Sequence, residues 1–299
     1  MRKERKILIA STEVVPFAKT GGLADVVSAL PKALEKLGVE VSVVMPRYRC
    51  IDEKEHKLKR VGSSFSVPMA GEMVEVSLKT AKLNKSKVNV YFVECEKYFD
   101  RDGLYGENGQ DYFDNDERFA LFSRSVVEMM KVLKLKPEVV HCNDWQTGLI
   151  PAYLRTVYKD DTFFDGVSTV MTIHSVAYQG IFPKSTMEKI GLPWETFSAD
   201  GVEYWDQVSY LKAGVVYADI INTVSPTYAC EIQSSPYRGK GFEGLLSYRS
   251  GDFYGILNGV DYSVWSPEKD TFLASTYDES DLRGKNRNKK ALQLSLIHI

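Results

Sequence analysis

The chain has 299 residues, of which 44% are hydrophobic and 26% are charged, a composition that excludes a disordered or fibrous protein and predicts a folded globular one. Its 38 Lys and Arg residues nearly balance its 40 Asp and Glu residues. Bulk charge therefore gives no reason to expect a nucleic-acid or membrane-surface partner, and we expect a small or neutral ligand.

The N-terminal part of the sequence predicts a βαβ unit. Residues 6–10 have the apolar run of a short buried strand, and a loop with Pro16, Gly21 and Gly22 follows. Apolar residues then recur at helical spacing over residues 23–37, and residues 39–45 predict a second strand. A strand, glycine loop, helix and strand in this order imply a parallel sheet.

The middle of the chain changes to alternating polar and apolar residues. Residues 61–93 predict β-hairpins inserted into the α/β frame. An amphipathic helix is expected next, because apolar residues recur at three- and four-residue steps from Phe119 to Leu133. Four further short buried strands are predicted at residues 138–141, 168–173, 219–224 and 253–257. The pattern favours a Rossmann-like parallel sheet, in which ligands bind beyond the carboxyl ends of the strands.

Two loops after predicted strands carry charged or aromatic residues. In the first, Lys19 precedes the paired Gly21 and Gly22 at a helix start, where backbone N–H groups and a cation suit a phosphate, although two glycines before a helix more often form a plain tight turn. In the second, Asp144 and Trp145 follow the strand at 138–141. They suit sugar hydroxyls and a sugar face, or alternatively a helix cap and core packing.

A third loop carries a lone histidine, His174, which taken singly is more often structural. Packing alone nevertheless does not easily explain why Lys19, Asp144 and His174 each follow the end of a predicted strand. Two other candidates receive structural interpretations. Asp114-Asn115-Asp116 resembles the D-x-D signature of metal-dependent sugar transferases but predicts helix capping. Lys212 predicts a solvated lysine on an amphipathic helix.

The cysteines and hydrophobic runs predict a cytoplasmic location. The four cysteines form no C-x-x-C pair, so neither a zinc site nor a disulfide framework is indicated. The apolar run before Ser11 is too short for a signal-peptide core. No stretch approaches the roughly 20 apolar residues of a membrane span, and we therefore expect no export and no membrane partner.

The order of several motifs resembles bacterial glycogen synthases and plant starch synthases. The motifs are KTGGLADV, HCNDWQTGL, TIHSVAYQG, SYLKAGVVYADIINTVSPTYACEI and GILNGVDYSVWSP. The resemblance covers residues 6 to about 293. It implies a retaining glucosyltransferase of the two-domain, GT-B type, which moves glucose from ADP-glucose to an α-1,4-glucan and needs no metal or other cofactor. The alternatives are a same-fold glucosyltransferase with another nucleotide-sugar donor and an inactive glucan-binding fragment.

The resemblance also assigns roles to individual residues. Lys19, Gly21 and Gly22 are expected at the donor phosphates, and Asp25, Asp144 and His174 near the reacting sugar and the acceptor. The remaining expected substrate-binding residues are Trp145, Tyr178 and Gln179. Within this site the sequence departs from the family pattern at one position: the residue after the histidine is Ser175, where the family usually has Asn.

The resemblance predicts a domain boundary near Trp265. Residues 1–265 are expected to form the N-terminal catalytic domain, and residues 266–299 a linker and the start of a donor-binding domain. From Leu294 the sequence departs from the family's pattern, so we expect a truncated or misread reading frame. Because the second domain's donor-binding groups are absent from the sequence, the chain alone is expected to be inactive.

Overall fold

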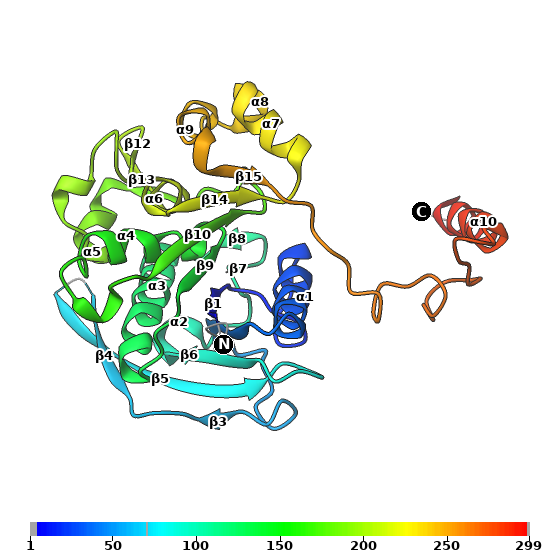
Figure 1. The fold of residues 1–299 in the computed structure, drawn as a ribbon, viewed down its shortest axis with the longest axis horizontal. Helices are drawn as coiled ribbons and strands as arrows, with labels where there is room; N and C mark the ends of the chain where they lie inside the picture. Colours follow the sequence, from blue (N-terminus) through cyan, green and yellow to red (C-terminus); the bar gives the residue numbers. More distant parts are fainter. Residues whose placement is uncertain (1–4, 70, 298–299) are drawn as a thin grey trace. The chain divides into compact units, whose positions relative to one another are not determined.

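The computed structural model describes residues 5–69 and 71–297 (Figure 1). It divides into two compact units, one up to Asn258 and one from Gly259. The larger unit contains a central sheet, and the smaller one contains a single described helix, α10 (Arg283–Ile297). The predicted role of residues 266–299 as a linker and the start of another domain stays a prediction.

The central sheet has the strand order β15-β14-β10-β9-β1-β2-β6-β5-β3, and β4 pairs with β5 off this path. Neighbours from β15 to β6 run parallel, whereas β5 is antiparallel to β6, β3 and β4. The strands are β1 (Lys6–Ala10), β2 (Glu40–Pro46), β3 (Lys59–Arg60), β4 (Phe65–Met69), β5 (Glu72–Lys82), β6 (Asn89–Glu94), β9 (Val139–Asn143), β10 (Ser168–Ile173), β14 (Ile220–Thr223) and β15 (Phe253–Gly255).

The strand order reverses between β1 and β9. The chain leaves β1 toward β2 and β6, and later returns to the other side of β1 to form β9, β10 and β14. Such a reversal opens a crevice at the carboxyl ends of the two strands, where ligands bind in open α/β sheets. The fold therefore marks the loops after β1, β9 and β10 as the place to look for a site.

Helices cover the sheet and connect its strands (Figure 1). Helix α3 (Asn115–Val132) is buried along most of its length, because it packs against both α4 and the strands β2 and β6. The other helices of the larger unit are α1 (Gly22–Lys36), α2 (Glu96–Phe99), α4 (Leu149–Arg155), α5 (Met187–Ile190), α6 (Tyr210–Tyr217), α7 (Pro226–Ser234), α8 (Pro236–Gly239) and α9 (Glu243–Tyr248). No helix among the described residues is long and apolar enough to cross a membrane.

Among the residues that the structure describes, two small sheets lie outside the central one. The first pairs β7 (Gly106–Glu107) with β8 (Gln110–Asp111). The second has the order β11-β13-β12, from β11 (Ile181–Pro183), β12 (Glu203–Tyr204) and β13 (Gln207–Ser209). Its strand β11 begins at Ile181, seven residues after His174. The sheet therefore holds the C-terminal end of the loop that carries His174.

The Rossmann-like parallel sheet and the hairpins predicted from the sequence are confirmed. Strands β4 and β5 pair antiparallel, and so do β5 and β6. Strand β6 also pairs in parallel with β2, so the hairpins continue the central sheet. Residues Val90 to Val93 of β6 are buried. Because alternation and short apolar runs do not reveal a strand's partner, only the tertiary structure shows that β6 pairs with β2.

Candidate functional site

The carboxyl ends of β1, β9 and β10 are joined by a chain of side-chain hydrogen bonds. Asn143, the last residue of β9, donates from Nδ2 to the carbonyl of Ala10 at the end of β1, at 3.1 Å. Its Oδ1 lies 2.9 Å from Nε2 of His174, directly after β10. His174 thus lies at the crevice that the strand order creates, and Asn143, which the sequence analysis missed, positions it.

The hydrogen bonds of Asn143 also determine the protonation of His174. Because Nδ2 of Asn143 donates to Ala10, its Oδ1 must accept, so Nε2 of His174 carries the proton. Burial lowers the pKa of His174 to about 4, partly opposed by the charge of Glu13. At neutral pH the ring is therefore uncharged, and its Nδ1 carries the lone pair.

Asp144 is fixed in the turn after β9. Its φ of 56° lies in the left-handed region, and its Oδ1 accepts the backbone N–H of His174 at 2.8 Å. Burial raises the pKa of Asp144 to about 7, with a further increase from the charge of Glu13, while N–H donors from His174 and Ser175 act in the opposite direction. Near pH 7 this carboxyl group can thus either accept or donate a hydrogen bond to a ligand hydroxyl.

Glu13 is a further residue of the site that the sequence analysis missed. It follows β1 and is only 4% exposed. Its carboxylate accepts hydrogen bonds from the backbone N–H groups of Thr20 and Gly21 and from the Thr20 hydroxyl, and the Tyr105 hydroxyl donates to it at 2.8 Å. The glycine loop is therefore held by the protein's own carboxylate. A carboxylate three residues after a strand is the signal that could have indicated it.

Lys19 and Asp25 form an ion pair at the start of α1. Nζ of Lys19 lies 2.7 Å from Oδ2 of Asp25, and both side chains are partly exposed. Gly21 precedes α1 in an extended conformation, and a Cβ added at Gly21 or Gly22 would meet no atom within 4 Å. The glycines therefore leave open space beside a helix N-terminus and a lysine, as the phosphate interpretation requires.

Trp145 lies in an aromatic cluster. Its ring centroid is 5.0 Å from that of Phe119 and 5.6 Å from that of Phe182, and it also contacts Tyr210. Gly180, with a φ of 57°, lies so close that a Cβ there would overlap the indole. These contacts favour the packing interpretation of Trp145, although the residue keeps a partly exposed surface.

Tyr178 and Gln179 are neighbours with opposite surroundings. Tyr178 is 68% exposed, whereas Gln179 is buried. Nε2 of Gln179 donates to the carbonyls of Val176 and Lys240. Gln179 therefore anchors the loop after β10, and Tyr178 is presented to solvent. The substrate-binding roles expected for both residues stay predictions.

The capping interpretation of Asp114-Asn115-Asp116 is confirmed in part, and the solvation interpretation of Lys212 is wrong. Asp116 lies in the first turn of α3 and its Oδ1 accepts the backbone N–H of Glu117 at 2.8 Å. Asp114 stands at the N-cap of α3 but makes no side-chain cap, because the Arg101 guanidinium holds both of its carboxylate oxygens. Asp116 binds Thr186 and Lys189. Lys212 is only 8% exposed, and its Nζ donates to the carbonyls of Ala199 and Glu203. The contacts with Arg101, Thr186 and Lys189, and those of Lys212, are not visible in local spacing, since every one of these partners lies nine or more residues away in the sequence.

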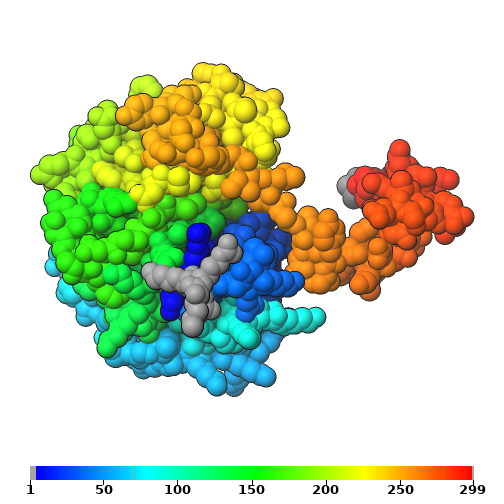
Figure 2. All heavy atoms as spheres, in the orientation of Figure 1, coloured from blue at the N-terminus to red at the C-terminus, as the bar shows by residue number. Residues whose placement is uncertain are grey.

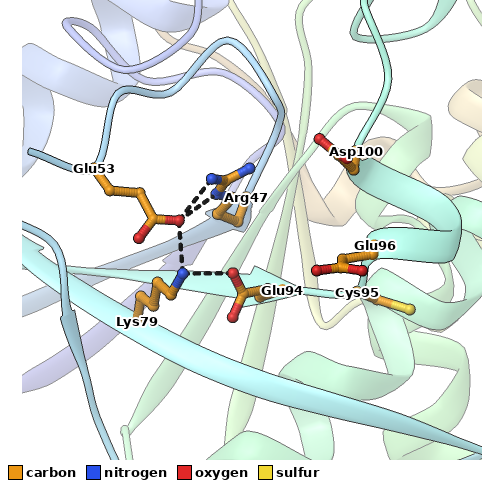
Figure 3. A pocket seen from close by; sticks show the side chains of 7 residues that line it. All are labelled: Arg47, Glu53, Lys79, Glu94, Cys95, Glu96 and Asp100. Atoms are coloured by element: carbon orange, nitrogen blue, oxygen red, sulfur yellow. Dashed lines mark hydrogen bonds and ion pairs between the residues drawn. The ribbon is translucent and has the colours of Figure 1, made fainter.

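A cavity of about 210 Å³ lies beside the carboxyl ends of β2 and β6. Its basic residues, Arg47 and Lys79, are both paired with Glu53, and Lys79 also with Glu94 (Figure 3). No predicted site residue lines it. Within residues 5–69 and 71–297, no three His, Cys, Asp or Glu side chains lie together as metal ligands would.

The fold and the site together define a Rossmann-like α/β domain with polar groups gathered at the strand-order reversal. The chain belongs to the starch synthase catalytic-domain family, whose sequence pattern matches residues 6–248. It is 46% identical over 293 residues to a glycogen synthase of Syntrophotalea carbinolica, covering 97% of this chain and 59% of that protein. A glycogen synthase of Koribacter versatilis is 47% identical over 286 residues, with 96% and 58% covered.

The fold is shared with a solved plant structure. The catalytic domain of starch synthase IV from Arabidopsis thaliana, bound to ADP and acarbose, superposes with a TM-score of 0.84 at 32% identity, covering 98% of this chain and 59% of that one. These similarities confirm the family resemblance and the GT-B-type fold expected from the motifs. The chain spans about three fifths of the length of these relatives.

Proposed function

We propose that this chain forms the acceptor-side half of a glycogen or starch synthase, a retaining glucosyltransferase that moves glucose from ADP-glucose to the non-reducing end of an α-1,4-glucan. The observation that carries the proposal is the joining of Asp144, His174 and Asn143 at the strand-order reversal of a starch synthase catalytic domain. The names of the relatives, and the ADP and acarbose bound to the Arabidopsis domain, support the same donor and acceptor classes.

The donor diphosphate is proposed to lie against the start of α1. The first N–H groups of a helix have no partner within the helix and carry its positive end. Glu13 accepts the amides of Thr20 and Gly21, so the phosphates would meet amides from Gly22 onward and the ammonium of Lys19. These groups supply positive charge to a departing diphosphate, and we propose that neither a metal ion nor an organic cofactor is needed.

The reacting sugar is proposed to lie between Asp144 and His174. A neutral His174 with its proton on Nε2 is held by Asn143, so it orients a sugar hydroxyl through Nδ1 or its carbonyl in preference to acting as a general base. Asp144 would bind a second hydroxyl. Asp25 is proposed to position Lys19, and Tyr178 and the exposed edge of Trp145 to line the path of the glucan. The four free cysteines support a reducing cytoplasm as the setting.

The test is transfer of labelled glucose from ADP-glucose to glycogen by a chimera that joins this chain to the C-terminal part of the Syntrophotalea carbinolica enzyme. Lys19→Ala should lower kcat/KM by about 30- to 1,000-fold, which corresponds to about 2 to 4 kcal/mol of transition-state stabilisation. Its melting temperature should stay unchanged, because Lys19 is exposed. Activity within about threefold of the unaltered chimera would remove Lys19 from the site.

The same chimera separates the alternatives. A shift in donor preference toward UDP-glucose, relative to the unaltered Syntrophotalea carbinolica enzyme that supplies the second domain, would assign another nucleotide-sugar donor. Co-sedimentation with glycogen, combined with no transfer from either donor, would assign a non-catalytic glucan-binding role.

A further inference from the structure

The four residues 19–22, at the start of α1, are exposed, although the chain on both sides of them is fixed. On the N-terminal side, Val14 and Ala18 exchange two backbone hydrogen bonds of 3.0 Å, and Phe17 is only 5% exposed. On the C-terminal side, Leu23 is buried in the first turn of α1. The exposed stretch contains two glycines, so contacts other than core packing must hold it in one conformation.

Helix α1 is also held beyond its first turn. The backbone N–H of Val15 donates to the carbonyl of Ala24, and Oε1 of Glu35 accepts the backbone N–H of Lys87 at 2.8 Å. In the space-filling view, the blue surface of α1 adjoins the cyan surface of residues near 85 (Figure 2). The exposed residues 19–22 therefore connect two fixed parts of the larger unit.

The carboxylate of Glu13 supplies the missing contacts. Its Oε2 accepts the backbone N–H groups of Thr20 at 2.5 Å and of Gly21 at 3.0 Å. Its Oε1 accepts the Thr20 hydroxyl at 2.6 Å and the Tyr105 hydroxyl at 2.8 Å. A carboxylate offers about four lone-pair sites, so its accepting capacity is filled. Three of the four hydrogen bonds go to the exposed stretch.

Tyr105 holds Glu13 from a separate segment. Because a carboxylate only accepts, the Tyr105 hydroxyl donates its proton to Glu13, and its oxygen accepts the Thr12 hydroxyl at 2.8 Å. The segment that carries Tyr105 is itself anchored, since the fully buried Arg118 donates from Nη2 to the carbonyl of Leu104 at 3.0 Å. The carboxylate is therefore held in one orientation behind the loop.

We propose that Glu13 is a positioning residue for the transfer reaction: by holding the amides of Thr20 and Gly21, it keeps Lys19 and the first turn of α1 in the geometry that receives the donor diphosphate. This inference rests on the proposed function. Glu13 is buried behind the loop and acts through Lys19, so it need not touch the substrate. A misplacement of about 1 Å in a reacting group can cost on the order of 100-fold in rate.

The two conservative variants of Glu13 separate hydrogen bonding from charge. In Glu13→Gln, the amide oxygen can accept both backbone N–H groups, and the amide nitrogen can donate to the hydroxyls of Thr20 and Tyr105, because a hydroxyl also accepts. All four hydrogen bonds survive without the charge. Glu13→Asp keeps the charge, but its side chain is shorter by one carbon–carbon bond of about 1.5 Å and does not reach the same donors.

The first measurement is transfer by the chimera with the Syntrophotalea carbinolica C-terminal part, beside the melting temperature. Glu13→Ala and Glu13→Asp should lower kcat/KM at least about tenfold, whereas Glu13→Gln should stay within about threefold of the unaltered chimera. In a chimera that already carries Lys19→Ala, Glu13→Ala should cost less than about threefold more, because both changes remove the same positioned group. A merely structural role predicts effects that add.

The second measurement uses the 299-residue chain itself. Hydrogen exchange followed by NMR should be at least about tenfold faster at the amides of Thr20 and Gly21 in Glu13→Ala than in the unaltered chain. The matched control is Asp116→Ala, which removes a carboxylate that is 3% exposed and holds Thr186. This control should lower the melting temperature but leave both amides and kcat/KM within about threefold of the unaltered proteins.

Three outcomes overturn the positioning role while the proposed function stands: Glu13→Ala within about threefold of an active chimera, a loss of the same size with and without Lys19, or better activity in Glu13→Asp than in Glu13→Gln. If the unaltered chimera transfers no glucose from ADP-glucose, the positioning role and the proposed function are both overturned.

Discussion

At the scale of single residues, the candidate site depends on two groups whose pKa values burial shifts toward the uncharged form. Burial raises the pKa of Asp144 to about 7 and lowers that of His174 to about 4. The nearby charge of Glu13 favours the protonated form of both groups. The site is therefore less charged at neutral pH than its residue types suggest, which suits binding of neutral sugar hydroxyls.

Asp144 should make unfolding pH-dependent. Its folded pKa of about 7 lies above the unfolded value of about 3.9, so its contribution to stability is full below about pH 4 and is lost as pH rises through 7. Relative to wild type, Asp144→Asn should therefore gain up to about 4 kcal/mol in unfolding free energy between pH 4 and pH 8. Urea denaturation at several pH values measures this difference.

The comparison between Asp144→Asn and wild type also separates the contribution of Asp144 to the pH dependence of stability from that of His174. The folded pKa of His174 is lowered to about 4, so its contribution is present above about pH 6.5 and is lost as pH falls through 4. Because both proteins contain His174, its effect cancels in the difference. A difference that stays flat from pH 4 to pH 8 would contradict the raised pKa of Asp144.

At the scale of elements, the loop after β10 is positioned by packing as much as by hydrogen bonds. Gly180, at a φ of 57°, faces the Trp145 ring, which itself packs on Phe119 and Phe182. On the other side, Gln179 anchors the loop to Lys240. The aromatic cluster around Trp145 therefore supports the loop that carries His174 and Tyr178.

Gly180→Ala should destabilise the protein by about 2 kcal/mol or more, because the added methyl group meets the indole and the backbone conformation disfavours any side chain. The melting temperature measures this. Gly21→Ala is the matched control, since its backbone is extended and a Cβ there meets no atom within 4 Å. If the two variants melt at the same temperature, packing at Gly180 does not position the loop.

At the scale of the whole molecule, order is concentrated in the larger unit. The central strands β1, β9 and β10 are flanked by buried helices, whereas residues 259–282 contain no described helix or strand. On α10, large apolar residues such as Leu292 and Leu294 are exposed. Stability against local opening should follow this division.

Hydrogen exchange should show the division directly. Amides of β1, β9 and β10 should exchange only through global unfolding, while amides of residues 259–282 should exchange within seconds to minutes at neutral pH. Mass spectrometry of peptic fragments distinguishes the two groups. Protection of residues 259–282 equal to that of β9 would show that they belong to the same cooperative unit.

The sequence by itself determined the order of strands and helices, the parallel core, and Asp144 and His174 as residues of the strand ends. These features depend on local periodicity and on the rule that parallel strands end at one edge. Local spacing could not show that Asp114 is held by Arg101, that Lys212 is buried, that β6 pairs with β2, or that Glu13 accepts the glycine-loop amides. Each of these depends on partners at least eight residues away in the chain, beyond the three- and four-residue steps of helical periodicity and the two-residue step of strands. Only the tertiary structure brings such partners within hydrogen-bonding distance.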